Sequence, residues 1–319
     1  MLDPSAGAIE APVVRPVGRP QRRARGYWSE SWERLRNDRI GFACGLLILF
    51  FGLIALAAPL LAAVVTHHDP FRQDLANTFA QPGQFSYALG SDELGRDTLT
   101  RLIYGARVSL LVAYLTVILA LIVGGSVGML AGYFGGWLDT VLMRLVDMVL
   151  SIPSIYLLIL LTALSPRIGP VALDPGNPYS LAVIIALVSW GSLARLVRAE
   201  VLTVKERDFM LATRSLGASD WRLMTRHLLP NVLAVMVVAA SLQVGAIIVT
   251  EAALDFIGLG ITPPTASWGN MLSNSQVYFY HSLWLVILPG LAIFITVLAM
   301  NVFGNTVRDA FDPRLRELR

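Results

Sequence analysis

The sequence predicts an all-α integral membrane protein with six transmembrane helices. Three observations support this fold class: the composition, the spacing of the apolar segments and the distribution of the basic residues. Of the 319 residues, 55% are hydrophobic and 15% are charged, with a mean hydropathy of +0.63, whereas soluble domains have about 25% charged residues. The basic residues lie between apolar segments and not among aromatic residues on one polar face, which argues against nucleic-acid binding.

The apolar segments are long enough to cross a bilayer, whose hydrocarbon core takes about 20 helical residues. The six predicted spans are 40–65, 108–131, 141–164, 179–197, 231–254 and 283–303, and together they make a predicted membrane domain over 40–305. The first is too long and too far along the chain for a cleaved signal peptide. It contains Cys44, the only cysteine, which excludes an intrachain disulfide and predicts a small buried hydrophobic residue.

The chain before the first span divides into two predicted parts. Residues 1–26 are rich in proline and arginine and are predicted to form a disordered cytoplasmic tail. In residues 27–39, Trp28, Trp32 and Leu35 recur at helical spacing with arginines alongside. This pattern predicts a short helix lying at the lipid surface, and a solvated helix is the alternative.

The basic residues also predict the orientation, because cytoplasmic loops carry an excess of Lys and Arg. Residues 1–39 hold eight arginines, 195–226 hold seven basic residues, and the tail 306–319 holds four arginines. The loop 258–282 has no Lys or Arg, and acids outnumber bases in residues 66–97. We therefore predict cytoplasmic termini, an external segment over 66–107, and a cytoplasmic segment over 198–230.

The cytoplasmic segment has the pattern of a helical hairpin. Apolar residues precede Gly217, which suits the left-handed end of a helix; Ser219 or Asp220 can cap a second helix, on which Trp221, Met224 and Leu228 form an apolar stripe. Pro230 suits the first turn of the next span. The segment could instead be a connector lying on anionic lipid. Connectors can be a few residues long, however, so about thirty structured residues favour a docking surface.

This segment resembles the EAA loop of the permeases of ABC importers. That pattern is Glu-Ala-Ala, three residues, Gly, nine residues and Ile-x-Leu-Pro. Here Leu211, Ala212 and Thr213 stand at the first three positions, and Gly217 follows at the correct spacing. The last four positions are His227, Leu228, Leu229 and Pro230. Leu211 replaces the family's carboxylate, so a polar contact made through that residue is not expected here.

Three further stretches are similar to the C-type permease subunit of dipeptide, oligopeptide and nickel importers. They are "LGSDELGRDTLTRLIYGARVSL", "EAALDFIGLGITPPTASWGNML" and, near the C-terminus, "FGNTVRDAFDPRLR". The resemblance covers nearly all of residues 27–316. It implies a multi-pass protein of the bacterial inner membrane.

The resemblance also implies partners: a homologous permease subunit in a heterodimer, two ATPase subunits and an extracytoplasmic substrate-binding protein, with lipid around the spans. The second helix of the hairpin would be a coupling helix seated on an ATPase, with Trp221 and Met224 as apolar anchors and Arg222 and Arg226 facing acidic groups. The residues assigned to this coupling site are Leu211, Ala212, Gly217, Ala218, Ser219, Asp220, Trp221, Arg222, Met224, Arg226 and Pro230.

The sequence has no phosphate-binding loop, which needs Gly-x4-Gly-Lys-Ser/Thr. Lys205 is the only lysine, and no glycine lies near it in "EVLTVKER". We therefore expect no cofactor on this chain, and we expect ATP and Mg²⁺ to bind the partner subunits.

Polar residues within the spans are candidates for lining a path. Ser151 and Ser154 lie in the third span, and Ser241, Gln243 and Thr250 lie in the fifth. Hydrogen bonds between helices explain them equally well. The small residues Gly124, Gly128 and Gly132 share one helix face, and they predict close packing either within this chain or with a sister subunit.

For most of the charged residues in or near the spans, we expect a structural role. We expect Arg144 and Asp147 to neutralise each other across one helical turn, and Glu251 and Asp255 to lie at the outer surface without needing burial. Asp92, Glu93, Arg96 and Asp97 either help to receive substrate from the binding protein or pack an external loop. No metal site is expected, because the adjacent His67 and His68, followed by Asp69, point apart in most backbones.

The sequence thus predicts a permease subunit that forms half of a path for peptides. A permease for nickel or another small solute is the alternative, since these importers share the same signatures. A stand-alone secondary transporter would need ion sites at broken helices related by an internal repeat, and the sequence shows no repeat. An intramembrane enzyme would need a nucleophile or metal motif, and none is present.

Overall fold

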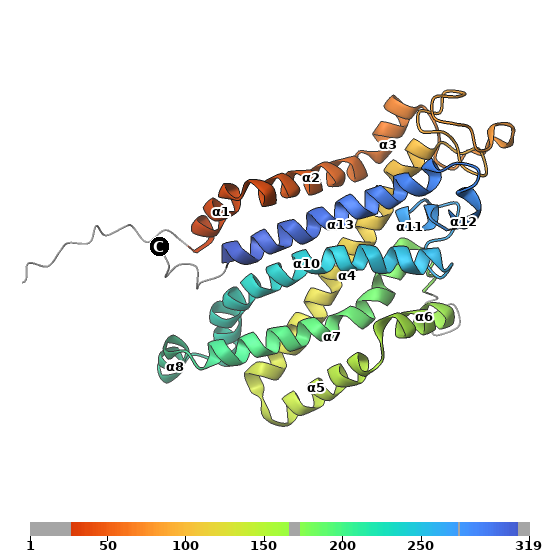
Figure 1. Ribbon diagram of the computed structural model, residues 1–319. Helices are drawn as coiled ribbons and strands as arrows, with labels where there is room; N and C mark the ends of the chain where they lie inside the picture. The colour runs from red at the N-terminus through yellow and green to blue at the C-terminus, as the bar shows by residue number, and fades with distance from the viewer. Residues whose placement is uncertain (1–26, 166–172, 274, 312–319) are drawn as a thin grey trace, which may run out of the picture.

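A computed structural model describes residues 27–165, 173–273 and 275–311, and these ranges contain helices and no β-strand. The predictions for 1–26 and for the end of the C-terminal tail fall outside the described residues. Figure 1 shows the long helices side by side, with α4 inclined across the others. The helices of eight residues or more are α1 (Tyr27–Asn37), α2 (Arg39–Leu56), α4 (Thr98–Phe134), α5 (Gly136–Ser151), α6 (Ser154–Leu164), α7 (Pro178–Lys205), α8 (Asp208–Ser215), α10 (Leu229–Phe256) and α13 (Trp284–Phe311).

Five helices in the described residues are long and apolar enough to cross a membrane, and a sixth span results if α5 and α6 are counted together. The all-α membrane fold is therefore confirmed. The third predicted span is not one straight helix, however, because α5 and α6 meet at 88°. Pro153 forces the preceding Ile152 into an extended conformation (φ −97°, ψ 130°), as proline does to the residue before it. The prediction of an uninterrupted helix over 141–164 was wrong.

The first predicted span also ends early. α2 stops at Leu56, and Pro59 stands in the first turn of the next short helix, α3 (Ala58–Leu61). A π-helical turn, Ala62–Thr66, follows. Proline suits the first turn of a helix and disrupts an interior, so the apolar run 40–65 divides where this residue occurs.

The other spans run beyond their predicted bounds. α4 begins at Thr98, where Asp97 accepts a hydrogen bond from the Thr100 N–H at 2.7 Å, so the last ten residues of the predicted external segment, 98–107, are helical. Its 37 residues extend roughly 55 Å at 1.5 Å per residue. α13 continues to Phe311, so the predicted tail 306–319 begins as helix.

α4 and α7 pack closely because glycines replace side chains at their crossing. A Cβ on Gly124 would lie 2.5 Å from the Trp190 carbonyl oxygen, and one on Gly128 would lie 2.4 Å from that of Ala194. Gly132 similarly faces Val201. The sequence left open whether these glycines contact a sister chain or this one, and the structure places them against α7.

The segment between the first two spans is largely non-helical and is ordered by side-chain contacts. Tyr87 is buried, and its hydroxyl donates to the Gly95 carbonyl at 3.1 Å; burial raises the pKa of Tyr87 above its usual value. The His68 ring stacks on Tyr87 with centroids 5.0 Å apart. A hydrogen bond donated by Asn77 lowers the pKa of Asp74.

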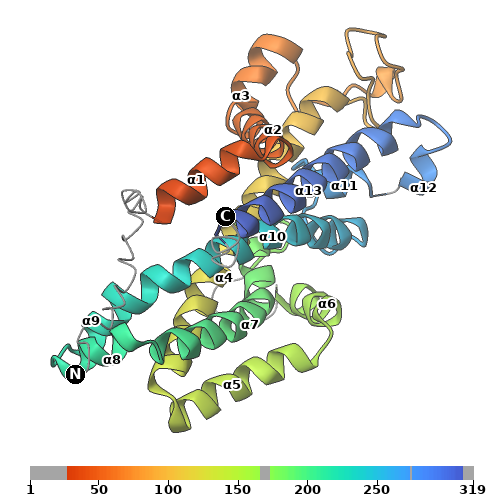
Figure 2. The same ribbon diagram turned by 60° about the vertical axis from the view of Figure 1, so that its left-hand side comes forward.

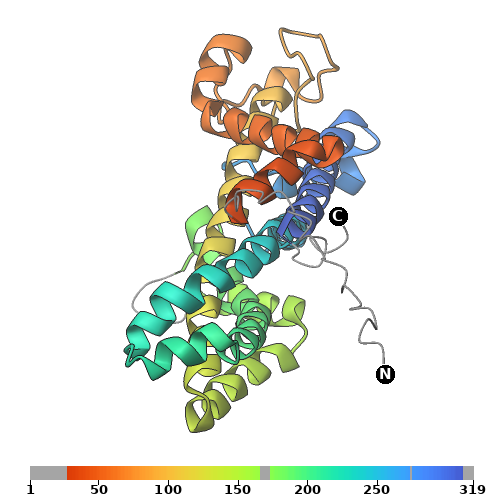
Figure 3. The same cartoon turned by 90° about the vertical axis from the view of Figure 1, so that its left-hand side faces the viewer.

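The helix bundle has two distinct ends. In Figure 1, α1, α8 and the last turns of α13 lie at one end, while the segment after α3 and the short helices α11 (Trp268–Met271) and α12 (Ser275–Tyr278) lie at the other. Figure 3 views the bundle from the first end, with α2 at one edge and α5 and α6 at the opposite edge. The hairpin and the segments predicted to be external therefore lie at opposite ends of the long helices.

Candidate functional site

The predicted hairpin is formed by residues 208–228, which connect α7 to α10 and which we call the hairpin (Figure 2). Its first arm, α8, ends in a glycine turn. Gly217 has φ +80°, and its N–H bonds the Arg214 carbonyl at 3.0 Å while the Ala218 N–H bonds that of Thr213 at 3.4 Å. These two bonds make a Schellman motif. The predicted left-handed helix end at Gly217 is confirmed.

The second arm of the hairpin is not a separate helix. α9 (Asp220–Arg222) continues through a π-helical segment, Leu223–Leu228, directly into α10. Proline cannot donate a main-chain hydrogen bond, and its ring crowds the carbonyl one turn earlier, so a wider π turn before Pro230 relieves this conflict. The Asn231 side chain donates to the His227 carbonyl at 2.7 Å. The predicted re-entry at Pro230 is thus a change of helix geometry and not a new helix.

The tip of the hairpin exposes large apolar side chains together with basic ones. Trp221 is 75% exposed and Leu216 is 88% exposed, and Leu211 is also exposed. Arg222 and Arg226 are exposed beside Trp221, and Ala212, Ser219 and Asp220 are exposed around the turn. Ser219 precedes α9 as its N-cap residue but makes no side-chain capping bond.

Met224 was predicted as a docking anchor, and this prediction was wrong. Its side chain is buried with Leu223 and Leu228 in a cluster that includes Val201 and Val204 of α7, and Ala218 packs against this cluster. The apolar stripe of the second arm therefore divides. Met224 and Leu228 hold the hairpin to the spans, whereas Trp221 is exposed to solvent.

A polar contact that the sequence did not suggest also holds the hairpin. The Tyr133 hydroxyl, at the end of α4, donates to Asp220 Oδ1 at 2.5 Å. Lys205, in the last turn of α7, donates from Nζ to the Tyr133 carbonyl oxygen at 2.6 Å. The sequence offered no sign of the Tyr133–Asp220 bond, and for the Lys205–Tyr133 bond its only sign was that Lys205 is the single lysine.

A second candidate site is a cavity of about 1240 Å³ between α6, α7, α10 and the end of α13. Of the predicted path residues, Ser154, Gln243 and Thr250 line it, and so do Ser189 and Ser192 of α7, which the sequence analysis missed. Serines three residues apart on an apolar helix were the available signal.

Two predicted path residues lie elsewhere. The Ser151 hydroxyl bonds the Met148 carbonyl at 2.7 Å, one turn earlier in its own helix, and it is not among the residues that line the cavity. Ser241 faces α13, because a Cβ placed on Gly304 would lie 3.2 Å from its hydroxyl oxygen. Both hydroxyls bond carbonyls of their own helices, Ser241 that of Val238 at 2.8 Å, and so make neither the path contacts nor the hydrogen bonds between helices that the two interpretations expected.

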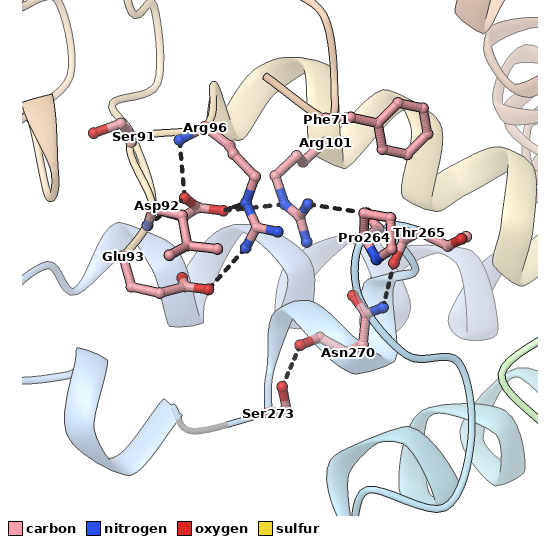
Figure 4. Close-up of polar contacts among 12 residues, drawn as sticks. Phe71, Ser91, Asp92, Glu93, Arg96, Arg101, Pro264, Thr265, Asn270 and Ser273 are labelled. Atoms are coloured by element: carbon pink, nitrogen blue, oxygen red, sulfur yellow. Dashed lines mark hydrogen bonds and ion pairs between the residues drawn. The ribbon is translucent and has the colours of Figure 1, made fainter. Parts of the chain in front are cut away.

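The acids and arginines of the predicted external segment form a compact ion-pair cluster (Figure 4). Arg96 bonds Asp92 at 2.6 Å and Glu93 at 2.7 Å, and Arg101 lies 3.2 Å from Asp92. Arg101 also approaches the Pro264 carbonyl at 3.5 Å, which links α4 to the loop after α10. In that loop, the Asn270 amide donates to the Thr265 carbonyl at 2.6 Å. The cluster fixes the external loops against each other.

Glu251 and Asp255 are buried, with exposures of 0% and 2%, contrary to prediction. Glu251 accepts a hydrogen bond from the Ser109 hydroxyl at 3.1 Å. Asp255 accepts from the Ile261 N–H at 2.6 Å and from the Ser267 hydroxyl. The loop after α10 folds back over the end of that helix, and together with α4 it covers both carboxyl groups.

The predicted pairing of Arg144 with Asp147 was also wrong. Asp147 instead lies 2.5 Å from Arg195 of α7. Asp139 at the start of α5 accepts two hydrogen bonds from Arg198, at 2.5 and 2.6 Å. Both carboxylates therefore join α5 to α7, a relation between segments about fifty residues apart that helical spacing cannot show.

Comparison with known protein families shows to which family the chain belongs. A family model described as "binding-protein-dependent transport system inner membrane component" matches residues 124–317, more than half of the chain. The chain belongs to this family. A second model, described as the N-terminal TM domain of oligopeptide transport permease C, matches residues 26–82. The family assignment agrees with the multi-pass helical architecture and makes the chain an inner-membrane component.

Several curated relatives of this inner-membrane component are similar over most of their length. The di/tripeptide transport system permease protein DppC of Pseudomonas aeruginosa is 40% identical over 90% of this chain and 92% of the relative. The dipeptide transport system permease protein DppC of Alkalihalophilus pseudofirmus is 35% identical over 91% and 90%. The glutathione transport system permease protein GsiD of Pectobacterium atrosepticum is 35% identical over 96% and 95%.

The fold of this inner-membrane component also occurs in a solved transporter. A chain of the MetNI methionine ABC transporter in an inward-facing conformation aligns with a TM-score of 0.54 and 19% identity. The alignment covers 66% of this chain and 97% of that chain. At this identity the likeness shows that the two chains share an ABC permease fold.

Proposed function

We propose that this chain is one of two related permease subunits of an ATP-driven importer, and that it forms half of the path for short peptides. In this proposal an extracytoplasmic binding protein delivers the cargo, and two ATPase subunits power the cycle. The family description and the names of the relatives support it, since dipeptides, tripeptides and glutathione are all short peptides.

The observation that carries the proposal is the exposed tip of the hairpin. Trp221 is 75% exposed on a short turn whose base is fixed by a buried apolar cluster. Aromatic and arginine side chains dominate the energetics of protein interfaces, and Trp221 lies next to Arg222 with Arg226 one turn further along. The tip is thus suited to dock into a groove of an ATPase that also presents acidic groups.

The cavity is the proposed path wall. Its polar lining includes Ser154, Ser189, Ser192, Gln243 and Thr250, and also the charged residues Glu200 near the end of α7, Arg207 between α7 and α8, and Arg308 in the last turn of α13. Hydroxyl and amide groups can exchange hydrogen bonds with peptide groups of any sequence. A second permease chain would close the other side of this path.

In this proposal the nucleotide chemistry takes place on the partners. ATP and Mg²⁺ bind the ATPase subunits, and this chain binds no cofactor and performs no hydrolysis. The sequence supports this, because its single lysine lies outside any glycine-rich loop. The proposal also puts the hairpin and both termini in the cytoplasm, which the excess of basic residues in these segments supports.

The test compares Trp221→Ala with Arg214→Ala in the complete transporter. Arg214 is also exposed on the hairpin but lies on α8, on the other arm. We expect Trp221→Ala to reduce co-purification of the ATPase subunits and peptide uptake together, and Arg214→Ala to change both little. Full co-purification and uptake with Trp221→Ala would contradict the assigned docking surface.

Cargo and energy source need separate measurements. Uptake of a labelled dipeptide and of Ni²⁺ by proteoliposomes that contain the full transporter, its binding protein and ATP distinguishes the peptide proposal from the metal alternative. The purified chain without partners should neither hydrolyse ATP nor accumulate dipeptide. Accumulation by the lone chain under an ion gradient would support a secondary transporter instead.

A further inference from the structure

We infer that Tyr133 is a positioning residue of the transport cycle, which transmits displacement of the hairpin to the paired helices α4 and α7 through its hydroxyl group. The inference rests on the proposed docking of the hairpin on an ATPase. It goes further by naming the contact through which motion of the hairpin reaches the spans.

Tyr133 occupies the point where three segments meet. Its side chain is buried at the end of α4, and its hydroxyl donates to Asp220 Oδ1 at 2.5 Å, in the first turn of the second hairpin arm. Lys205 lies over the ring, with Nζ 5.6 Å from the centroid, and bonds the Tyr133 carbonyl oxygen at 2.6 Å. The last carbonyl groups of a helix lack partners within the helix, so Lys205 of α7 supplies one.

The two helices that meet at Tyr133 move as one body. Gly124 and Gly128 of α4 bring the backbone of α7 so close that an added Cβ would lie 2.5 Å or less from a main-chain oxygen. Close-packed surfaces of this kind cannot slide without separating. The paired hydrogen bonds of Arg198 with Asp139 add α5 to the same body. A displacement applied at Tyr133 is therefore shared by α4, α7 and α5.

The hydroxyl contact differs from the apolar packing around it. Leu223 and Leu228 of the hairpin also touch α7 residues in the buried cluster, but apolar contact is non-directional and tolerates small slips. A hydrogen bond requires a short distance and a narrow angle, and here its acceptor is a carboxylate, which strengthens it. The Tyr133 hydroxyl therefore fixes the position of the hairpin along α4.

Movement of α7 would alter the wall of the cavity. Ser189 and Ser192 of α7 and Gln243 of α10 line it, and the Gln243 amide donates to the Ser189 carbonyl at 3.3 Å. α10 is continuous with the second hairpin arm, while α7 is joined to that arm by the buried apolar cluster and, through Lys205, by the directional contact of Tyr133. The two helices thus receive the motion by different connections, and their relative position defines this part of the wall.

The experiment measures peptide transported per ATP hydrolysed by the complete transporter in proteoliposomes. Tyr133→Phe removes one oxygen atom and leaves Trp221 and the basic residues of the tip in place. We expect normal co-purification of the ATPase subunits and continued ATP hydrolysis. Transport per ATP should fall about three- to tenfold, the range that the net contribution of one typical intramolecular hydrogen bond supports.

Matched variants separate this role from general destabilisation. Tyr114→Phe makes the same change at an exposed tyrosine of α4 and should leave the ratio unchanged. Asp220→Asn keeps an oxygen acceptor and should retain more coupling than Asp220→Ala. Tyr133→Phe should cost nothing further in the Asp220→Ala background, because the two groups share one interaction.

The outcomes are distinct. An unchanged ratio in Tyr133→Phe, or additive losses in the double variant, would overturn the inference. Loss of the ATPase subunits from the Tyr133→Phe complex would also overturn it, because the contact would then serve assembly. If the proposed function fails instead, Trp221→Ala will retain its ATPase subunits, a result that is independent of Tyr133.

Discussion

At the scale of single residues, the turn of the hairpin depends on one glycine. Gly217 has φ +80°, and no atom lies within 4 Å of the position that a Cβ would take. A substitution there is therefore opposed by the backbone conformation and not by crowding. The left-handed conformation costs a non-glycine residue roughly 1–2 kcal/mol, and β-branched residues tolerate it least, whereas asparagine is several-fold enriched in it.

We predict that Gly217→Val weakens both ATPase co-purification and peptide uptake while expression stays near normal, because the turn lies outside the spans. Gly217→Asn is the matched control and should retain most of both activities. The measurements are subunit stoichiometry after purification and initial uptake rates. Equal behaviour of the two variants would show that the left-handed backbone is not what the hairpin requires.

Asp38 joins the start of α2 to the end of α13, and it gives a pH-dependent prediction. Its carboxylate accepts a hydrogen bond from the Thr306 hydroxyl at 2.7 Å and caps α2 through the N–H groups of Ile40 and Gly41. The bond from Thr306, followed by the N–H of Gly41, lowers the pKa of Asp38. A lowered folded-state pKa means that this stabilisation is present above the unfolded value of about 3.9 and is lost as the pH falls through the folded value.

Asp38→Ala should therefore lower the free energy of unfolding at pH 7 by about 0.5–1 kcal/mol, the cost expected for losing an exposed helix cap. The melting temperature should fall accordingly. The difference from wild type should shrink by pH 3, where Asp38 begins to be protonated. Melting in detergent at both pH values provides the measurement, with Asp38→Asn as a capping control whose difference changes less. If the melting temperatures of wild type and Asp38→Ala differ by the same amount at both pH values, an ionised Asp38 is not the stabilising group.

At the scale of helices, the apolar segments predicted where the spans are but not where they bend. Hydropathy averages over a window, so one proline among apolar residues leaves the average high. Pro153 and Pro59 each interrupt a predicted span for this reason. Reading each proline as a break, with its effect on the preceding residue, would have located both. The burial of Glu251 and Asp255 could not be predicted, because their partners are Ser109 of α4 and Ile261 of the loop after the span.

The glycine face of α4 supplies a test at this scale. Glycine to alanine inside a helix favours the helix by roughly 0.5–1 kcal/mol when space is available. Gly52 of α2 has no atom within 4 Å of its would-be Cβ, whereas that of Gly128 would lie 2.4 Å from the Ala194 carbonyl oxygen. Gly52→Ala should raise or preserve the melting temperature. Gly128→Ala should lower it, because overpacking costs about 1–3 kcal/mol. Similar shifts in both variants would refute the close packing of α4 on α7.

At the scale of the whole molecule, the orientation in the membrane is open to direct measurement. The charge distribution predicts that the exposed Ser86 lies outside the cell membrane and the exposed Ser219 inside. With Cys44 replaced by Ala, we expect a membrane-impermeant thiol reagent to label Ser86→Cys but not Ser219→Cys in intact cells. Permeabilised cells, in which both should react, provide the control. The opposite labelling pattern would reverse the topology.

The sequence predicted the hairpin as a unit but not its attachment to the rest of the molecule. Its glycine turn and exposed tryptophan follow from local patterns of a few residues. Tyr133 and Asp220 lie 87 residues apart, and neither has a periodicity that points to the other. The burial of Met224 likewise depends on α7 lying beside the hairpin. Contacts of this kind are set by helix packing, which one sequence does not encode in any short pattern.

The continuous helical path from Asp220 to Phe256 also carries a thermodynamic consequence. One end bears the hairpin tip, and the other bears Asp255, which bonds Ser267 of the loop after α10, and Glu251, which bonds Ser109 of α4. Ser109 in turn accepts a hydrogen bond from the Trp268 N–H of α11. If a binding protein seated on that loop favours one position of this rod, it changes the affinity of the hairpin for an ATPase. Linkage is reciprocal, so the ATPase must change the affinity for the binding protein by the same factor, and measuring either affinity with and without the other partner gives the same coupling free energy.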